Sequence, residues 1–149
     1  MMASIHDIAV LLCNVMIGLL SGVYFIFSNT VMTSLAKANN GAAIMGAINE
    51  DILNPIFKLM FIISAVLSAY FAVFAPSIEL NERVAYAVFF IGTFVVTLVK
   101  NIPDNNRLKA QLKSPQELSQ VWQDYLKHWV FWNHIRSFSA ICSLVLLNM

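Results

Sequence analysis

Long stretches without a charged residue constrain this chain more than any other feature. No Asp, Glu, Lys or Arg occurs within residues 8–36, 59–78 or 84–99, and residues 129–149 contain only one, Arg136. A helix needs about 20 largely apolar residues to cross a bilayer. Because lipid offers the backbone no hydrogen-bond partners, a spanning segment must be a helix or part of a closed barrel. These stretches lack the strict alternation of barrel strands and therefore predict membrane-spanning helices.

The composition supports a membrane protein with a single domain. Of the 149 residues, 59% are hydrophobic and 11% are charged, whereas a soluble domain has about 25% charged residues. So few charges could not cover the core of a soluble globule of this size. We therefore predict an all-α fold, an integral membrane four-helix bundle. Its four predicted spans are approximately residues 8–35, 55–76, 83–102 and 129–148.

Two further helices are predicted at the membrane surface. Isoleucines recur at every fourth position of residues 42–53, which predicts a short amphipathic helix lying at the interface. Ser114-Pro115-Gln116-Glu117 is a capping box with proline in the first turn, which is typical of a helix start. We therefore predict a second surface helix over residues 115–128, and we expect it to continue into the last span as one long helix.

The basic residues are distributed unevenly between the two predicted sides of the bundle. The loops after the first and third spans lie on one side of the membrane. The loop after the second span lies on the other side, and its only basic residue is Arg83. Loops rich in Lys and Arg tend to face the cytoplasm, so we expect both termini outside, in a bacterial inner membrane. A net charge of +1 argues against a nucleic-acid partner. The basic residues of the first side are Lys37, Lys58, Lys100, Arg107, Lys109, Lys113 and Lys127.

The cysteines and histidines predict neither a disulfide framework nor a metal site. Cys13 and Cys142 both lie within apolar stretches and are expected to be small buried hydrophobic residues. His128 and His134 are not three or four residues apart, so a helix does not bring them onto one face. We therefore predict no metal ligands.

Arg136 lies where a charge is costly. It is seven residues beyond Trp129, which places it roughly 10 Å into the membrane at about 1.5 Å per residue. An ionisable side chain at this depth calls for a partner, a polar cavity or a ligand. One interpretation is that Arg136 snorkels to the interface or pairs with Asp104 or Asp124. The other is that it binds an anion or an oxyanion inside a cavity.

Three neighbours of Arg136 are further candidates. His134 is two residues away, roughly 200° around the helix, and so faces elsewhere. It is either a general base or a hydrogen-bonded structural residue. Asn133 is three residues from Arg136 and shares its face. Trp132 lies deeper than an interfacial tryptophan belt and is expected to line a pocket for a flat ligand.

Asparagines gather near the same membrane boundary. Asn101 and Asn105 belong to a polar segment, residues 101–108, which is predicted to form a turn after the third span. Asn29 lies near the end of the first span and Asn54 at the start of the second. Polar groups at one level predict a shared pocket, and ordinary capping of helix ends is the alternative. The group comprises Ser28, Asn29, Asn54, Asn101 and Asn133.

A stripe of small residues on the first span predicts close packing between helices. Gly18, Ser21 and Gly22 lie three or four residues apart. Small residues at this spacing allow another helix to approach closely. We therefore expect a neighbouring helix against this face.

A set of short motifs follows in order along nearly the whole chain. The motifs are Gly18-Leu19-Leu20-Ser21-Gly22-Val23-Tyr24-Phe25-Ile26-Phe27-Ser28, Val31-Met32, Ala47-Ile48-Asn49, Asn54-Pro55-Ile56-Phe57, Asn101-Ile102-Pro103-Asp104-Asn105-Asn106-Arg107-Leu108, Trp122 through Tyr125, and Trp129-Val130-Phe131-Trp132-Asn133-His134-Ile135-Arg136. This set resembles the anthrone oxygenase-like family of small integral membrane proteins. The chain departs from the family pattern at Thr33, where the family often has proline, and at Asp104, where a small or apolar residue is common. Asp104 is kept among the candidate residues despite this departure.

The resemblance implies an oxygenase. The activity named for the family is oxidation of polyketide anthrones to anthraquinones by dioxygen, with no required metal or flavin. By this resemblance we expect a membrane enzyme that binds a flat, lipophilic phenol or quinone-type molecule, with dioxygen as co-substrate and no cofactor. The expected catalytic residues are His134, Arg136 and Asp104, and the expected substrate-binding residues are Asn101, Asn105, Asn133, Trp132, Asn54 and Asn29.

A second hypothesis is a bundle without catalytic activity. Such a protein would bind a lipid or quinone, form a homo-oligomer, or serve as a small subunit of a larger membrane complex. The same polar cluster would then hold a headgroup or fix helix packing. A heme or copper site is a third hypothesis. In every case the lipid bilayer is an expected partner.

Overall fold

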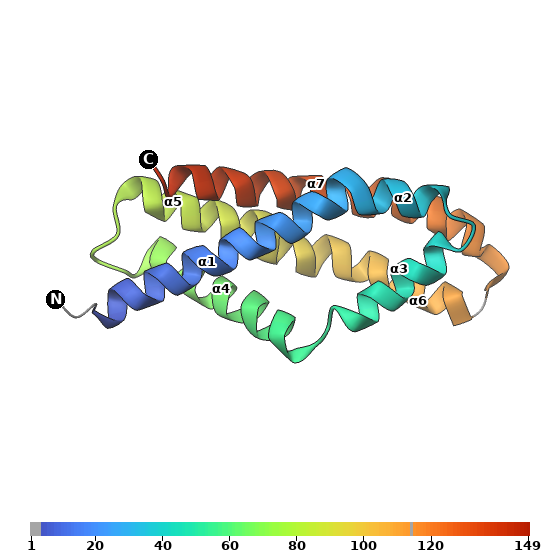
Figure 1. Cartoon of the computed structure of the whole chain (residues 1–149), viewed down its shortest axis with the longest axis horizontal. Coiled ribbons are helices and arrows are strands. Elements are labelled where there is room, and N and C mark those ends of the chain that lie inside the picture. The colour runs from blue at the N-terminus through green and yellow to red at the C-terminus, as the bar shows by residue number, and fades with distance from the viewer. Residues whose placement is uncertain (1–3, 114) are drawn as a thin grey trace.

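The chain folds into helices joined by short connections (Figure 1). The computed structural model describes residues 4–113 and 115–149, and no strand occurs among them. The predicted all-α fold is therefore confirmed. The elements are α1 Ile5–Ile26, η1 Phe27–Val31, α2 Met32–Lys37, α3 Gly41–Asp51, α4 Pro55–Val73, α5 Leu80–Phe89, η2 Phe90–Val95, η3 Thr97–Asn101, α6 Ile102–Lys113, η4 Pro115–Glu117 and α7 Leu118–Leu146.

The first long helix comprises α1, η1 and α2 and runs without a break over Ile5–Lys37. It starts with a capping box: the Ser4 hydroxyl accepts from the Asp7 amide at 3.1 Å, and the Asp7 carboxylate accepts from the Ser4 amide at 2.9 Å. These bonds satisfy amides that a helix start leaves free. The five residues of η1 form a π-helical turn inside the helix. Turns of this kind are rare and occur often at functional sites.

Another long helix runs over Leu80–Lys113 and comprises α5, η2, η3 and α6. The predicted polar turn over residues 101–108 is wrong, because these residues are helical. Proline normally interrupts an α-helix through its missing N–H and its ring. Here the π-helical turn η3 ends two residues before Pro103, so the hydrogen-bond register changes where the proline would otherwise break it.

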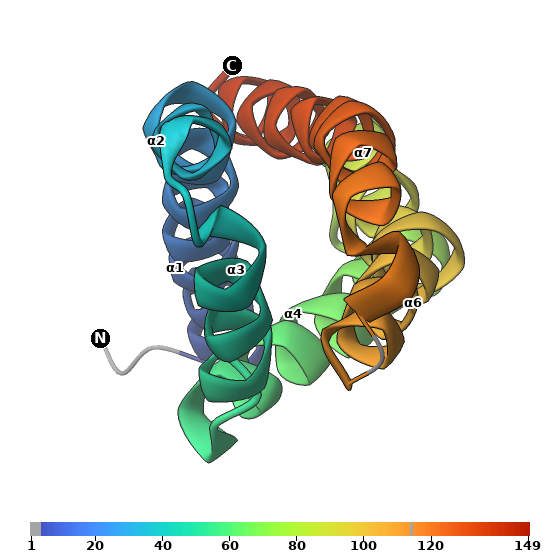
Figure 2. The same ribbon diagram turned by 90° about the vertical axis from the view of Figure 1, so that its right-hand side faces the viewer.

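The long helices form a ring in the order α1, α7, α5 and α4 (Figure 2). The two ends of the described chain lie together at one end of the bundle (Figure 1). At the other end, α2, α3, α6 and the first half of α7 form a compact region that we call the head. The prediction of one long last helix is confirmed by α7, although Ser114 of the predicted helix start lies outside the described residues.

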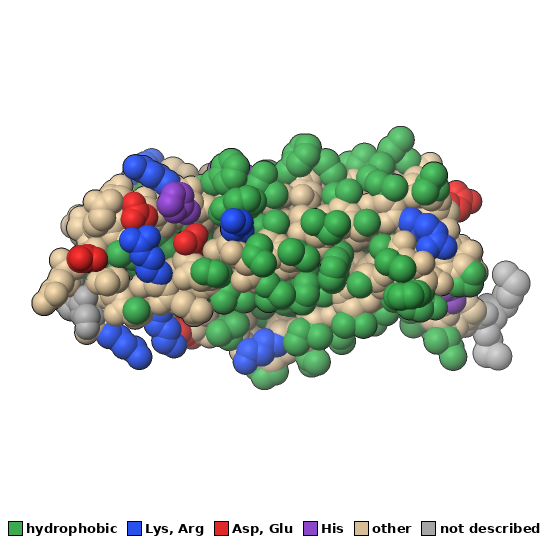
Figure 3. Space-filling view, turned by 180° about the vertical axis from the view of Figure 1, so that it is seen from behind, with side chains coloured by type: hydrophobic (Ala, Val, Ile, Leu, Met, Phe, Trp, Pro, Cys, Tyr) green, Lys and Arg blue, Asp and Glu red, His purple; other side chains and the backbone are tan. Residues whose placement is uncertain are grey.

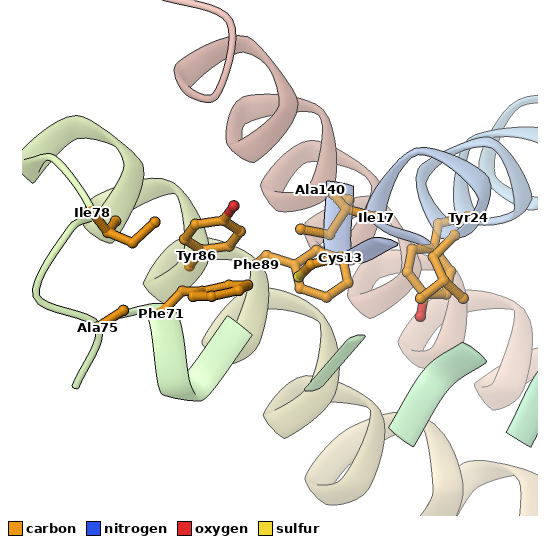
Figure 4. Packing of buried hydrophobic residues seen from close by; sticks show 10 residues of the cluster. Cys13, Ile17, Tyr24, Phe71, Ala75, Ile78, Tyr86, Phe89 and Ala140 are labelled. Atoms are coloured by element: carbon orange, nitrogen blue, oxygen red, sulfur yellow. The ribbon is translucent and has the colours of Figure 1, made fainter. Parts of the chain in front are cut away.

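Two clusters of buried hydrophobic side chains form the core, one in the bundle and one in the head. The bundle cluster includes the fully buried side chains of Ile17, Phe71 and Tyr86 (Figure 4). Cys13 belongs to it and is buried as expected, whereas Cys142 is half-buried; both thiols are free. The head cluster is built from Met32, Leu35, Ala42, Met45, Leu108, Val121, Trp122, Tyr125 and Trp129.

The space around each glycine shows where two helices approach closely. A Cβ atom added at Gly18 or Gly22 would meet no neighbour, so no helix of the described chain approaches closely at these two glycines, although Ser21 of the same stripe is buried. Close approaches occur instead at Gly92 of η2, where an added Cβ would collide with Ser139 of α7, and at Gly46 of α3, where it would collide with Leu112 of α6. Within the predicted spans, the glycine that allows close packing is therefore Gly92, on the third span.

The surface is that of an integral membrane protein. Three helices are long and apolar enough to cross a membrane: Ile5–Lys37, Pro55–Val73 and Leu80–Lys113. On the face seen in Figure 3, hydrophobic side chains cover the middle of the molecule, and most charged side chains lie toward its two ends. The fourth predicted span, in α7, is not among the three, because Asn133, His134 and Arg136 lower the hydropathy of that segment.

Candidate functional site

A cavity of about 300 Å³ is lined by residues of α3 and α6. The end of α1, the start of α4 and the middle of α7 complete its wall. Much of the wall is aromatic, with contributions from Tyr24, Phe27, Phe57, Phe61 and Trp129. Such a wall suits a flat apolar molecule.

Arg136 of α7 forms part of this wall and is only 6% exposed. Its Nη1 donates to the Thr97 hydroxyl at 3.1 Å, and its Nη2 donates to Asn133 Oδ1 at 2.6 Å. Its Cζ atom lies 4.6 Å from the ring centroid of Tyr24 and 5.2 Å from that of Trp129. Aromatic faces attract a cation at these distances. Neutral groups and rings therefore surround the buried charge.

No carboxylate pairs with Arg136 among the residues that the structure describes. Asp124 instead accepts from Arg107 at 3.1 Å, so it is not the partner of Arg136. Asp104 likewise forms no ion pair with Arg136 in the described chain. The interpretation that either acid neutralises Arg136 is therefore wrong.

Asn133 fixes the position of the guanidinium. Its Nδ2 donates to the backbone carbonyl of Tyr24 at 3.0 Å and to the Ser28 hydroxyl at 2.7 Å. The Ser28 hydroxyl lies 2.9 Å from that of Ser137. Ser28 belongs to the π-helical turn η1, so this turn presents a polar side chain to α7. The bonds leave Asn133 Oδ1 aimed at Arg136.

Three residues of the cavity wall each have a buried polar atom without a hydrogen-bond partner in the described structure. These atoms are Tyr24 Oη, Trp129 Nε1 and Arg136 Nε. Buried polar atoms are nearly always hydrogen-bonded, so unmet ones call for an explanation such as a ligand or water. All three residues line the same cavity, so Tyr24, Trp129 and Arg136 contribute to the polar part of its wall.

Asn105 and Asn101 occupy different positions. Asn105 lines the cavity, and its Oδ1 accepts from the hydroxyl of Tyr125 at 2.8 Å. Asn49 Nδ2 donates to the same hydroxyl at 3.3 Å, and burial raises the pKa of Tyr125 above its usual range. Asn101 is fully buried, lies outside the cavity wall, and donates to the carbonyl of Trp129 at 3.2 Å. It therefore supports the backbone of a wall residue.

The remaining predicted residues lie outside the cavity wall. His134 is exposed, on a different face of α7 from Arg136, as the helical spacing predicts. Trp132 is half-buried, with Lys100 Nζ 4.8 Å from its ring. Asp104 is half-buried in α6.

Asn29 and Asn54 are also outside, and both are exposed. Asn54 caps α4: its Oδ1 accepts from the Phe57 amide at 3.0 Å. Of the polar group expected to share a pocket, the structure joins only Ser28 and Asn133 directly. Asn54 and Asn101 instead bond to backbone groups, as the alternative of capping and local contacts expects.

Sequence reasoning missed Tyr24 and Thr97, which face Arg136 from other helices. Nothing in the local sequence distinguishes them, because each lies in an uncharged span. Trp129 was not predicted as a wall residue either, although the spacing of Trp129, Asn133 and Arg136 places them on one face of a helix.

The sequence of the chain matches a known protein family. The family model described as anthrone oxygenase matches residues 47–146, most of the chain. The chain belongs to the anthrone oxygenase family. The matched region of this family member runs from α3 to the end of α7 and includes Thr97, Asn133 and Arg136, whereas Tyr24 precedes it. No curated protein and no solved structure matches the chain.

Proposed function

We propose that this protein binds a flat, lipophilic phenol or quinone-type molecule in the cavity and oxidises it with dioxygen. One observation carries the proposal: a buried guanidinium without a carboxylate partner faces an aromatic-walled cavity in the described chain. Membership of the anthrone oxygenase family supports the same chemistry.

The proposed reaction proceeds through an anion of the substrate. An anthrone that loses a proton becomes an aromatic oxyanion, which is electron-rich and reacts with dioxygen. The ring CH₂ group becomes a carbonyl, and the second oxygen atom leaves as water. Arg136 is positioned to stabilise the oxyanion, and Asn133 holds Arg136 in place. A preorganised donor of this kind contributes about 3–4 kcal/mol to such a transition state.

We also propose how the chain sits in the membrane. The second half of α7 acts as a fourth span and completes a four-helix bundle in a bacterial inner membrane. The basic head faces the cytoplasm, and both termini lie outside. The shared location of the chain ends and the charged head support this arrangement (Figures 1 and 3). The hydrophobic Phe138 of α7 is 70% exposed, as expected for a side chain that faces lipid.

Oxygen uptake by the purified protein tests the activity. With 1,8-dihydroxyanthrone in detergent, uptake above the protein-free rate is expected, and Arg136→Ala should reduce it by about 100-fold or more. Lys127→Ala is the matched control, because it removes an exposed cation from the same helix outside the cavity. Equal turnover of wild type and Arg136→Ala would remove the role proposed for the guanidinium.

The same samples test the second hypothesis, a binding protein without catalytic activity. Binding of the compound without oxygen uptake would support the second hypothesis and refute the oxygenase. Native mass spectrometry would identify a retained lipid or quinone, and an absorption spectrum would reveal a heme.

A further inference from the structure

We infer that the cavity selects its ligand as an aromatic oxyanion and discriminates against neutral quinones of the same shape. The inference rests on the proposed binding function and specifies the chemical class of its ligand. The preferred ligand is a phenol acidic enough to be ionised near neutral pH. Charge balance in the wall, the absence of a base among the described wall residues and the aromatic lining support it.

Charge balance is the first support. Arginine keeps its proton in proteins, and a buried charge without a counter-ion is expensive. Thr97 and Asn133 offer neutral oxygens, and Tyr24 and Trp129 offer ring faces. These contacts leave the Nε donor unmet. An oxyanion in the cavity would supply the missing charge.

The rest of the wall is also positive. Its charged residues are Glu50, Lys58, Lys109 and Arg136. Glu50 pairs with Lys109 at 3.0 Å, so Lys58 and Arg136 are left without a carboxylate among the described residues. A pocket lined by one sign of charge with apolar walls concentrates ligands of the opposite sign.

The wall holds no well-placed base in the part of the chain that the structure describes. Glu50 is its only carboxylate, and that side chain is 63% exposed and paired with Lys109. His134 and Asp104 lie outside the wall. A weakly acidic ligand would therefore find no acceptor for its proton. A ligand that is already ionised, or that releases its proton to water, needs none.

A matched pair of probes tests this selection. 2-Hydroxy-1,4-naphthoquinone is an anion at neutral pH, and 2-methoxy-1,4-naphthoquinone has nearly the same shape without the charge. Calorimetric titration of the protein in zwitterionic nanodiscs, with empty nanodiscs as the blank, gives both affinities. We expect the hydroxy compound to bind at least about tenfold more tightly, a difference of about 1.4 kcal/mol.

Two variants of Thr97 test the role of charge without removing Arg136. Thr97→Asp places a carboxylate beside the guanidinium and should reduce the preference to within about twofold. Thr97→Asn is its neutral control and should keep the preference. Arg136→Gln should abolish it. The comparison of the two probes on wild-type protein decides the question even where a variant fails to fold.

The outcomes separate the two proposals. Equal affinity for both probes would refute the anion selection and leave the binding function standing. No binding of either probe would refute both. Displacement of the hydroxy compound by decanoate at equal concentration would refute the aromatic class and indicate a lipid-derived carboxylate. Weak displacement by decanoate together with the tenfold preference would establish an aromatic oxyanion site.

Discussion

Replacing Asn133 by alanine should destabilise this protein more than the same replacement at Asn101. The two asparagines are 0% and 1% exposed, so both variants lose the same atoms from a buried position, and their transfer and cavity terms largely cancel. Each asparagine also donates one bond to a backbone carbonyl, at 3.0 Å for Asn133 and 3.2 Å for Asn101. The other hydrogen bonds therefore determine the difference.

Asn133 has two bonds that Asn101 lacks. Its bond to the Ser28 hydroxyl is a neutral contact between helices, worth about 0.6 kcal/mol in membrane proteins. Its bond from Arg136 involves a charged donor at 2.6 Å, worth about 1.5–3 kcal/mol. Asn133→Ala should therefore lower the free energy of unfolding by about 2–3.5 kcal/mol more than Asn101→Ala.

Reversible unfolding by SDS in mixed micelles, followed by far-ultraviolet circular dichroism, measures both values. The double variant Asn133→Ala with Arg136→Met provides the control. Removing the charge as well should recover part of the loss, because no buried donor is then left without its acceptor. Equal destabilisation by Asn133→Ala and Asn101→Ala would refute the view that Asn133 holds the guanidinium.

Three further predictions use the same unfolding measurement. Gly92→Ala should lower stability by about 1–3 kcal/mol through its collision with Ser139, and adding Ser139→Gly should restore much of it; no recovery would place the strain elsewhere. Gly22→Ala should raise stability by about 0.5–1 kcal/mol, because the site is open and alanine favours a helix; a loss would indicate a partner on that face. Lys109→Ala should change stability by less than about 1 kcal/mol, since the Lys109–Glu50 pair is mostly exposed; a larger loss would show that the pair fastens α3 to α6.

The features that follow from helical spacing and charge could be predicted from the sequence. The uncharged stretches located the apolar helices, since burying a charge in lipid is costly whatever the fold. The spacing of Asn133, His134 and Arg136 placed the first and last on one face of α7 and His134 on another, as the structure has them. The continuous α7 also followed from its side-chain pattern.

Other features depend on contacts between distant segments. Asn101 to Leu108 carries the local signals of a turn, but packing of α6 against α3 and α7 keeps it helical. The π-helical turn η1 has no obvious signal in its sequence, yet it places Ser28 against Asn133. Asn29 and Asn54 were expected in a pocket only from their depth, which says nothing of the direction in which a side chain points.

A structure of the protein with bound 2-hydroxy-1,4-naphthoquinone tests the central claim most directly. The account predicts the ring inside the cavity, between Phe57 or Phe61 on one side and Trp129 on the other, with its ionised oxygen within hydrogen-bonding distance of the Arg136 guanidinium. Density for the ring only in the apolar groove formed by α4 and η2, with Arg136 unchanged beside an empty cavity, would contradict it.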